Sequence, residues 1–133
     1  QLKAYLEQEL VRHPNLIVLG DFNIAPEDRD VHDVKSWQGK VLVSPLERQA
    51  LKEIMALGFK DSFRLFNNQS GHYTWWDYRA GAFRRNRGLR IDHILTSDAL
   101  TSRCIACDID KEISLWEKPS DHVPVVASYQ NIS

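Results

Sequence analysis

A short apolar run, LIVLG at residues 16–20, leads directly into the polar residues Asp21 and Asn23. A run of this length, bounded by Pro14 and Gly20, is typical of a strand that is buried on both faces. Polar side chains at the end of such a strand are held by a rigid scaffold while they face solvent, and catalytic groups often have this arrangement. The sequence therefore predicts a candidate site at the strand exit, although such a loop by itself is more often a capping turn.

Helical and extended patterns alternate along the rest of the chain. Leucines at Leu2, Leu6 and Leu10 predict an amphipathic helix that ends at His13 and Pro14. A second helix is predicted over residues 45–58, where Gly58 provides the stop. Its apolar stripe consists of Leu46, Ala50, Leu51, Ile54 and Leu57. Strands are expected over residues 73–76, 90–96, 104–109 and 122–129, and residues 61–66 are expected to form a short helical or extended piece.

Composition excludes several classes of protein. Hydrophobic residues make up 43% of the 133 residues and charged residues 26%, values that are ordinary for a globular domain and far from those of a disordered chain. No apolar run approaches the roughly 18 residues that span a bilayer, so no membrane partner is expected. Two cysteines cannot build a disulfide framework, and the reducing cytoplasm is the expected location.

A basic segment stands out against the net charge of −1. Five arginines and a single aspartate lie between Asp77 and Arg90, and aromatic residues are interleaved with them. Arginine contacts phosphate groups while aromatic rings stack on bases or wedge between them, so this pattern favours a nucleic-acid surface. A solvated loop without a ligand is the alternative.

Two further carboxylate–histidine pairs occur in RIDHIL and SDHVPV. Strand alternation places Asp92 and His93 on opposite faces, so His93 is interpreted as a structural histidine. An aspartate behind a histidine fixes the tautomer of the ring and favours its charged form. We therefore expect Asp92 to orient His122, which leaves Asp121 free to bind a metal ion. The CxxC pair, Cys104 and Cys107, is expected to lie on opposite faces of a strand as two buried thiols and not as a redox motif.

The segments GDFN, TWWDYR, NRGLRIDHIL and EKPSDHVPV, in this order, resemble the exonuclease III family. That family belongs to a superfamily of metal-dependent phosphodiesterases that includes DNase I and the apurinic/apyrimidinic endonucleases. The resemblance implies an α+β fold, namely the C-terminal half of a four-layer α/β/β/α sandwich with mixed, mostly antiparallel sheets. Residues 1–133 would form this part of a single domain. The missing N-terminal half, which supplies an Asn, a metal-binding Glu and a catalytic Tyr in the family, would be its partner within a monomeric parent protein.

The resemblance also implies roles for individual residues. Asp21 would position or deprotonate the attacking water, Asn23 would hydrogen-bond the phosphate, and His122 would donate to a non-bridging oxygen with Asp92 behind it. The expected ligands of Mg²⁺ or Mn²⁺ are Asp121 and, as further possibilities, Asp21, Asn23 and His122. The residues expected to contact DNA are Trp75, Leu89 and Ile91, as walls of a pocket for an abasic sugar, and Trp76, Arg79 and Arg90 as neighbours that face DNA. For the tryptophans, core packing is the alternative.

The expected function is that of a metal-dependent DNA repair nuclease. It would remove nucleotides from 3′ ends of double-stranded DNA and cut 5′ to abasic sites by attack of water on the phosphodiester. Two alternatives stay open. The parent could be another phosphodiesterase of the superfamily that acts on inositol phosphates or lipids, or the isolated chain could be an inactive DNA-binding or folding unit.

Overall fold

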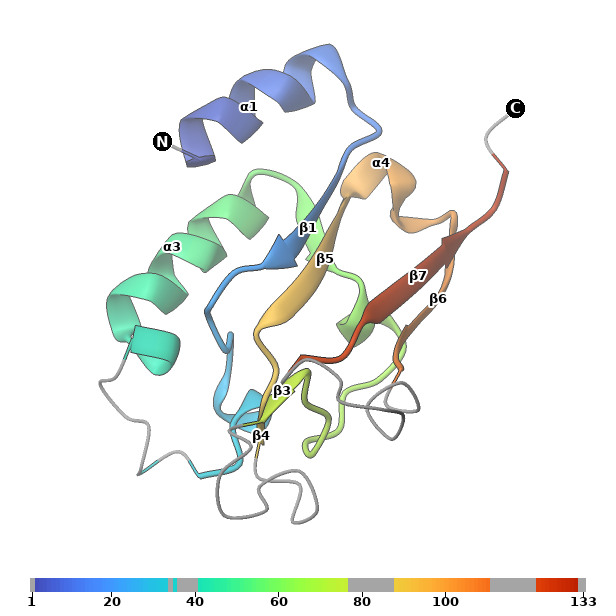
Figure 1. Cartoon of the computed structure of the whole chain (residues 1–133). Coiled ribbons are helices and arrows are strands. Elements are labelled where there is room, and N and C mark those ends of the chain that lie inside the picture. The colour runs from blue at the N-terminus through green and yellow to red at the C-terminus, as the bar shows by residue number, and fades with distance from the viewer. Residues whose placement is uncertain (1, 34, 36–40, 77–87, 111–121, 132–133) are drawn as a thin grey trace.

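The computed structural model describes residues 2–33, 35, 41–76, 88–110 and 122–131 (Figure 1). The helices are α1 (Leu2–Arg12), α3 (Pro45–Ala56) and α4 (Asp98–Thr101), with single 3₁₀ turns η1 (Asp28–Asp30), η2 (Val41–Val43) and η3 (Phe63–Leu65). The strands are β1 (Ile17–Asp21), β2 (Phe59–Asp61), β3 (Trp75–Trp76), β4 (Gly88–Leu89), β5 (Asp92–Ser97), β6 (Cys104–Ile109) and β7 (Val125–Tyr129). All strand pairs among the described residues are antiparallel, which fits the predicted α+β class.

Strand β5 is the centre of the fold. It lies between β1 and β2 in a three-stranded sheet, and its register aligns Asp21 with Asp92 and Ile17 with Thr96. Leu95 packs into a core formed with α1 and α3, whereas Ile94 packs towards β6 and β7. Figure 1 shows the two helices to one side of β5 and the β6–β7 pair to the other. The described residues thus form three layers, which are helices, a first sheet and a second, two-stranded sheet.

Helix α3 packs on the first sheet through two buried residues in its second half. Leu51 and Ile54 are buried against the first sheet, and Gly58 follows the helix with a φ of 126°, a value that glycine tolerates. The predicted apolar stripe is too wide, because Leu46 is 80% exposed and Ala50 is also exposed. Successive residues are about 100° apart around a helix, so Leu46 and Ala50 lie on the flank of a stripe centred on Leu51 and Ile54.

Strand β1 is not buried on both faces, contrary to the prediction. It is an edge strand of its sheet, and Leu19 is 67% exposed while Val18 packs against the helical layer. Strand β7 behaves in the same way, because Val126 is 52% exposed whereas Val125 and Ala127 pack inward. Apolar runs were interpreted as strands covered on two sides, and in the described part of the chain only one side of each is covered.

Five buried polar groups form an ion-pair cluster beneath β5. The guanidinium of Arg90, which is only 1% exposed, contacts both oxygens of Asp61 and donates from Nε to Asp30 at 2.7 Å. Arg64 also pairs with Asp30, and Nη1 of Arg90 lies 3.2 Å from Nδ1 of His93. Arg90 therefore joins η1, β2 and β5 through charge-assisted bonds.

The pKa values in this cluster follow from its geometry. Burial by itself would raise the pKa of Asp61, but the charge of Arg90 and its hydrogen bonds outweigh burial and hold that pKa below its usual value. Burial would likewise lower the pKa of Arg90, and the two carboxylates raise it instead. Burial and the charge of Arg90 lower the pKa of His93, which keeps its imidazole neutral.

The two cysteines are free and both are buried. A register irregularity between Cys104 and Ala106 interrupts the alternation of β6, so Cys104 and Cys107 both turn inward and the prediction of opposite faces is wrong. Burial, together with the neighbouring Cys104, raises the pKa of Cys107 to about 12. The thiol is therefore inert at neutral pH, in keeping with the structural interpretation. Among the described residues, no helix has the length and apolarity to cross a membrane.

Candidate active site

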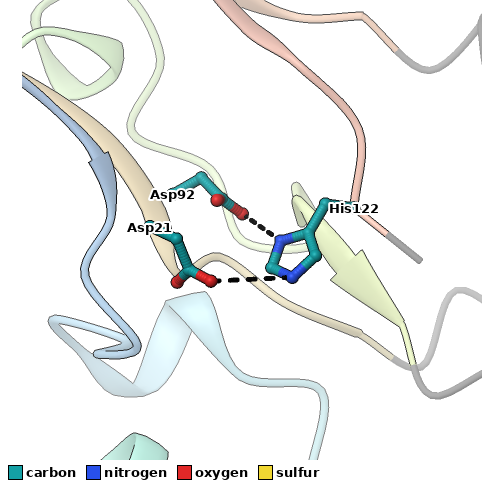
Figure 2. A group of neighbouring side chains, drawn as sticks. All are labelled: Asp21, Asp92 and His122. Atoms are coloured by element: carbon teal, nitrogen blue, oxygen red, sulfur yellow. Dashed lines mark hydrogen bonds and ion pairs between the residues drawn. The ribbon is translucent and has the colours of Figure 1, made fainter. Parts of the chain in front are cut away.

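Three side chains from distant parts of the sequence converge where β1 ends and β5 begins. Asp21 and Asp92 are register partners on neighbouring strands, and His122 lies across from them just before β7. Figure 2 shows the two carboxylates facing the imidazole from the same side, with Nδ1 2.8 Å from Oδ2 of Asp92 and Nε2 3.6 Å from Oδ2 of Asp21. The predicted contact between Asp92 and His122 is therefore present in the fold.

The buried Thr74 fixes the relative positions of Asp92 and His122. Its Oγ1 accepts hydrogen bonds from the backbone N–H groups of Ile91, at 3.0 Å, and Asp92, at 3.1 Å. Its backbone carbonyl accepts from the N–H of Val123 at 2.8 Å. One residue thus ties together the two segments that carry the pair. Sequence reasoning missed it, because nothing in the local sequence marks a threonine that acts through residues far along the chain.

The loop after β1 turns sharply to present Asp21. The N–H of Asn23 donates to Oδ1 of Asp21 at 2.9 Å, and Asn23 has a φ of 53°, in the left-handed region that asparagine tolerates better than most residues. The N–H of Phe22 donates to the carbonyl of Ile91 at 3.0 Å, which ties the loop to the segment before Asp92. The side chains of Asp21 and Asn23 are both exposed at this site.

The hydrogen bonds determine what each atom of the site can do. A carboxylate only accepts, so Nδ1 of His122 must carry the hydrogen of the bond to Asp92. This leaves Nε2 of His122 and Oδ2 of Asp21 directed into the space between them. A protonated ring could donate from Nε2, and a neutral ring could offer its lone pair there. Asp92 thus orients the imidazole and favours its positive charge.

The same three residues have the chemistry of a cation site. One possible ligand atom from each of Asp21, Asp92 and His122 lies within 4.8 Å of the others. Carboxylate oxygens are ligands that Mg²⁺ and Mn²⁺ prefer, and the site carries two of them against one imidazole. A cavity of about 160 Å³ adjoins the site, lined by Asp21, Asp92 and apolar neighbours such as Leu19 and Val123. The donor set therefore fits a hydrated divalent ion.

The structure revises the predicted DNA surface. Arg90, expected to face DNA, is enclosed in the ion-pair cluster because Asp30 and Asp61 neutralise it there. Trp76 is 3% exposed and packs with Tyr73 and Val123, so the core-packing alternative holds for it.

Leu89 and Ile91, predicted as pocket walls, are also buried, and they belong to the core cluster against which the half-buried Trp75 packs. Five of the six predicted DNA contacts lie among the described residues, and of these five only Trp75 is partly exposed. Arg79, like the predicted metal ligand Asp121, lies outside the described residues.

Fold and site together define an α+β sandwich with an acidic, histidine-containing site at the ends of its strands. The chain belongs to the endonuclease/exonuclease/phosphatase family, whose sequence profile matches residues 1–122. The predicted resemblance and the predicted fold class are both confirmed.

Individual relatives and solved structures are similar to this chain over nearly its whole length. Exodeoxyribonuclease III of Haemophilus influenzae is 40% identical over 136 residues, covering 97% of this chain and 51% of that relative. A 3′ phosphatase from Neisseria, NExo, bound to a product DNA hairpin, superposes with a TM-score of 0.94 at 42% identity, covering 97% of this chain and 50% of that one. An AP endonuclease from Archaeoglobus fulgidus gives 0.92 at 38% identity, covering 98% of this chain and 51% of that one. The chain spans about half the length of these relatives.

Proposed function

We propose that the complete protein is a divalent-metal-dependent DNA repair nuclease. It would remove nucleotides from 3′ ends of double-stranded DNA and cut 5′ to abasic sites by attack of water on the phosphodiester. The observation that carries the proposal is the 2.8 Å bond between Nδ1 of His122 and Asp92, with Asp21 facing Nε2 of the same ring. The names of the relatives support DNA as the substrate, since they are an exodeoxyribonuclease, an AP endonuclease and a 3′ phosphatase bound to a DNA hairpin.

Each site residue has a role that its contacts support. Oδ1 of Asp21 is occupied by the N–H of Asn23, which leaves Oδ2 to orient the attacking water and accept its proton. His122, held by Asp92, donates from Nε2 to a non-bridging phosphate oxygen as charge develops there. Asn23 hydrogen-bonds the same phosphate. Preorganised donors of this kind stabilise the transition state without rearrangement during the reaction.

The proposed cofactor is Mg²⁺ or Mn²⁺. Asp21 and the undescribed Asp121 would hold the ion, with Asn23 and His122 as further candidates, because their oxygen and nitrogen atoms suit a hard cation. When bound, the ion would neutralise charge on the phosphate. Nδ1 of His122 is engaged by Asp92, so donation to phosphate or ligation of the ion would come from Nε2.

The exposed apolar side chains support a further part of the proposal, that the site is completed by an N-terminal half of the same domain. Leu19, Ile105 and Val126 are each more than half exposed on sheet strands. Within the proposal, the N-terminal half covers these side chains. Within this proposal the complete protein is a monomer, and the free thiols fit a reducing cytoplasm.

The test is cleavage of a duplex with one abasic site, in Mg²⁺ and in EDTA. The chain is assayed alone and after addition of the N-terminal half. Activity confined to the reconstituted sample with metal supports the proposal, whereas equal activity of the chain alone contradicts the split site. His122→Ala should reduce turnover by several orders of magnitude, and His13→Ala, at an exposed histidine after α1, serves as the matched control. Hydrolysis of inositol phosphates in place of DNA would favour the alternative phosphodiesterase.

A further inference from the structure

We propose that His93 is a positioning residue for the active-site loop that carries Asp21 and Asn23. The inference rests on the proposed function, because it concerns how the nuclease site is held in shape. The sequence predicts a structural histidine at this position, and the contacts of His93 show which part of the structure it holds in place.

His93 supports the loop from beneath. The side chain is only 2% exposed, and its Nε2 lies 2.7 Å from the backbone carbonyl of Ile24, one residue beyond Asn23. The ring of Phe22 packs against the imidazole with centroids 5.7 Å apart at 52°. His93 therefore contacts the loop on both sides of Asn23, the residue whose backbone is in the left-handed region.

The hydrogen-bond partners of His93 leave one tautomer. Nη1 of Arg90 lies 3.2 Å from Nδ1, and a guanidinium has donors but no acceptor, so Nδ1 must accept. The single hydrogen of the neutral ring is then on Nε2, where it donates to Ile24. Arg90 is itself held by Asp61 and Asp30, so the tautomer is set by a chain of buried contacts that runs from the ion-pair cluster to the loop.

Strand alternation gives the arrangement its logic. Asp92 points to His122 in the site, and the next residue, His93, points to the other face and reaches the loop after β1. In the register, Asp21 is opposite Asp92 and Gly20 is opposite His93. Two consecutive residues of β5 thus position both sides of the site. A misplacement of about 1 Å at a reacting group can cost on the order of 100-fold in rate, so the loop anchor is kinetically significant.

The kinetic test uses three variants of the complete protein. His93→Phe keeps a ring of similar size but removes both hydrogen bonds, and it should lower kcat by roughly 30- to 100-fold with KM changed by less than about threefold. His93→Gln keeps a donor for Ile24 and an acceptor for Arg90, and it should recover most of this loss. The matched control is Cys107→Ala, at a buried residue whose packing cluster contains neither Phe22 nor Ile24.

A kcat of His93→Phe within about threefold of that of Cys107→Ala, or a failure of His93→Gln to recover, would overturn the inference. Nitrogen-15 NMR gives a readout that does not depend on activity. The inference requires a hydrogen on Nε2 of His93 and altered amide resonances of Phe22 and Asn23 in His93→Phe but not in Cys107→Ala. A hydrogen on Nδ1, or unaltered loop amides, would refute it. If the wild type cleaves no phosphodiester, the proposed function fails, and these spectra still decide the inference about the loop.

Discussion

Replacement of Arg90 by methionine should strongly lower the free energy of unfolding at neutral pH. Methionine fills a similar volume but leaves Asp61, whose side chain is 8% exposed, without the guanidinium that contacts both of its oxygens. Asp30 keeps Arg64, so the uncompensated charge falls on Asp61. Removal of one partner from a buried ion pair costs about 3–5 kcal/mol in the free energy of unfolding, and we expect Arg90→Met to lie in this range. Arg12→Met, at a largely exposed arginine, should change stability by less than about 0.5 kcal/mol.

The pH dependence of this loss has a definite sign. In the wild type the pKa of Asp61 is lowered, so its contribution to stability is present above the unfolded pKa of about 3.9 and is lost as the pH falls through the folded pKa. Without Arg90, burial is the dominant influence and the pKa of Asp61 rises above its unfolded value. The folded variant then gains a proton as the pH is lowered, and the stability difference from wild type should shrink between pH 7 and pH 5.

Urea unfolding followed by tryptophan fluorescence at both pH values measures these quantities. The double variant Arg90→Met/Asp61→Asn removes the unpaired charge as well, and it should be more stable than Arg90→Met alone by about 1–3 kcal/mol at pH 7. A loss below about 1 kcal/mol for Arg90→Met, a loss that does not change with pH, or a double variant no more stable than the single one would refute the reasoning.

Two further substitutions and one labelling experiment test other parts of the structure. Asp92→Asn should lower turnover on abasic duplex by roughly 10²- to 10⁴-fold, because an amide no longer fixes the protonated Nδ1 of His122. The control Asp108→Asn, at an exposed position of β6, should leave turnover in the same assay unchanged. Thr74→Val removes the acceptor for two backbone N–H groups and should reduce both stability and turnover, whereas Thr74→Ser should retain both, as measured by thermal unfolding and steady-state kinetics. Cys107 should resist alkylation by iodoacetamide at pH 8 and react only after denaturation, since its pKa is raised to about 12; rapid labelling of the folded chain would contradict this.

Local patterns predicted much of the fold. The bounds of β6 agree with the prediction, and α1 and α3 end within two residues of where leucine spacing and Gly58 placed them. The contact between Asp92 and His122 was also expected from the residue types alone. Their catalytic roles stay predictions, because proximity defines what the atoms can do and only kinetics measures what they contribute.

Tertiary partners explain what the sequence could not predict. Arg90 ends a basic segment, and nothing local distinguishes it from an arginine that faces DNA; its burial depends on Asp30 and Asp61, which are 60 and 29 residues away. The bulge that turns both cysteines inward arises from the pairing of β6 with β7. Thr74 was overlooked because a single threonine acquires its importance only when the segments containing Asp92 and Val123 pack beside it.

Asp92 and His93 act on opposite faces of β5, and this arrangement also limits how the strand can vary in length. A change in length that shifted the strand by one residue against β1 would exchange its two faces, which would bring His93 into the site and place Asp92 under the loop. All the remaining side chains of the strand would move to the opposite layer at the same time. A change in length there would therefore need a compensating bulge, such as the one in β6, to keep both residues in place. Among descendants of this sequence, the spacing from Arg90 to Leu95 should be more constant than the identity of any of its apolar residues.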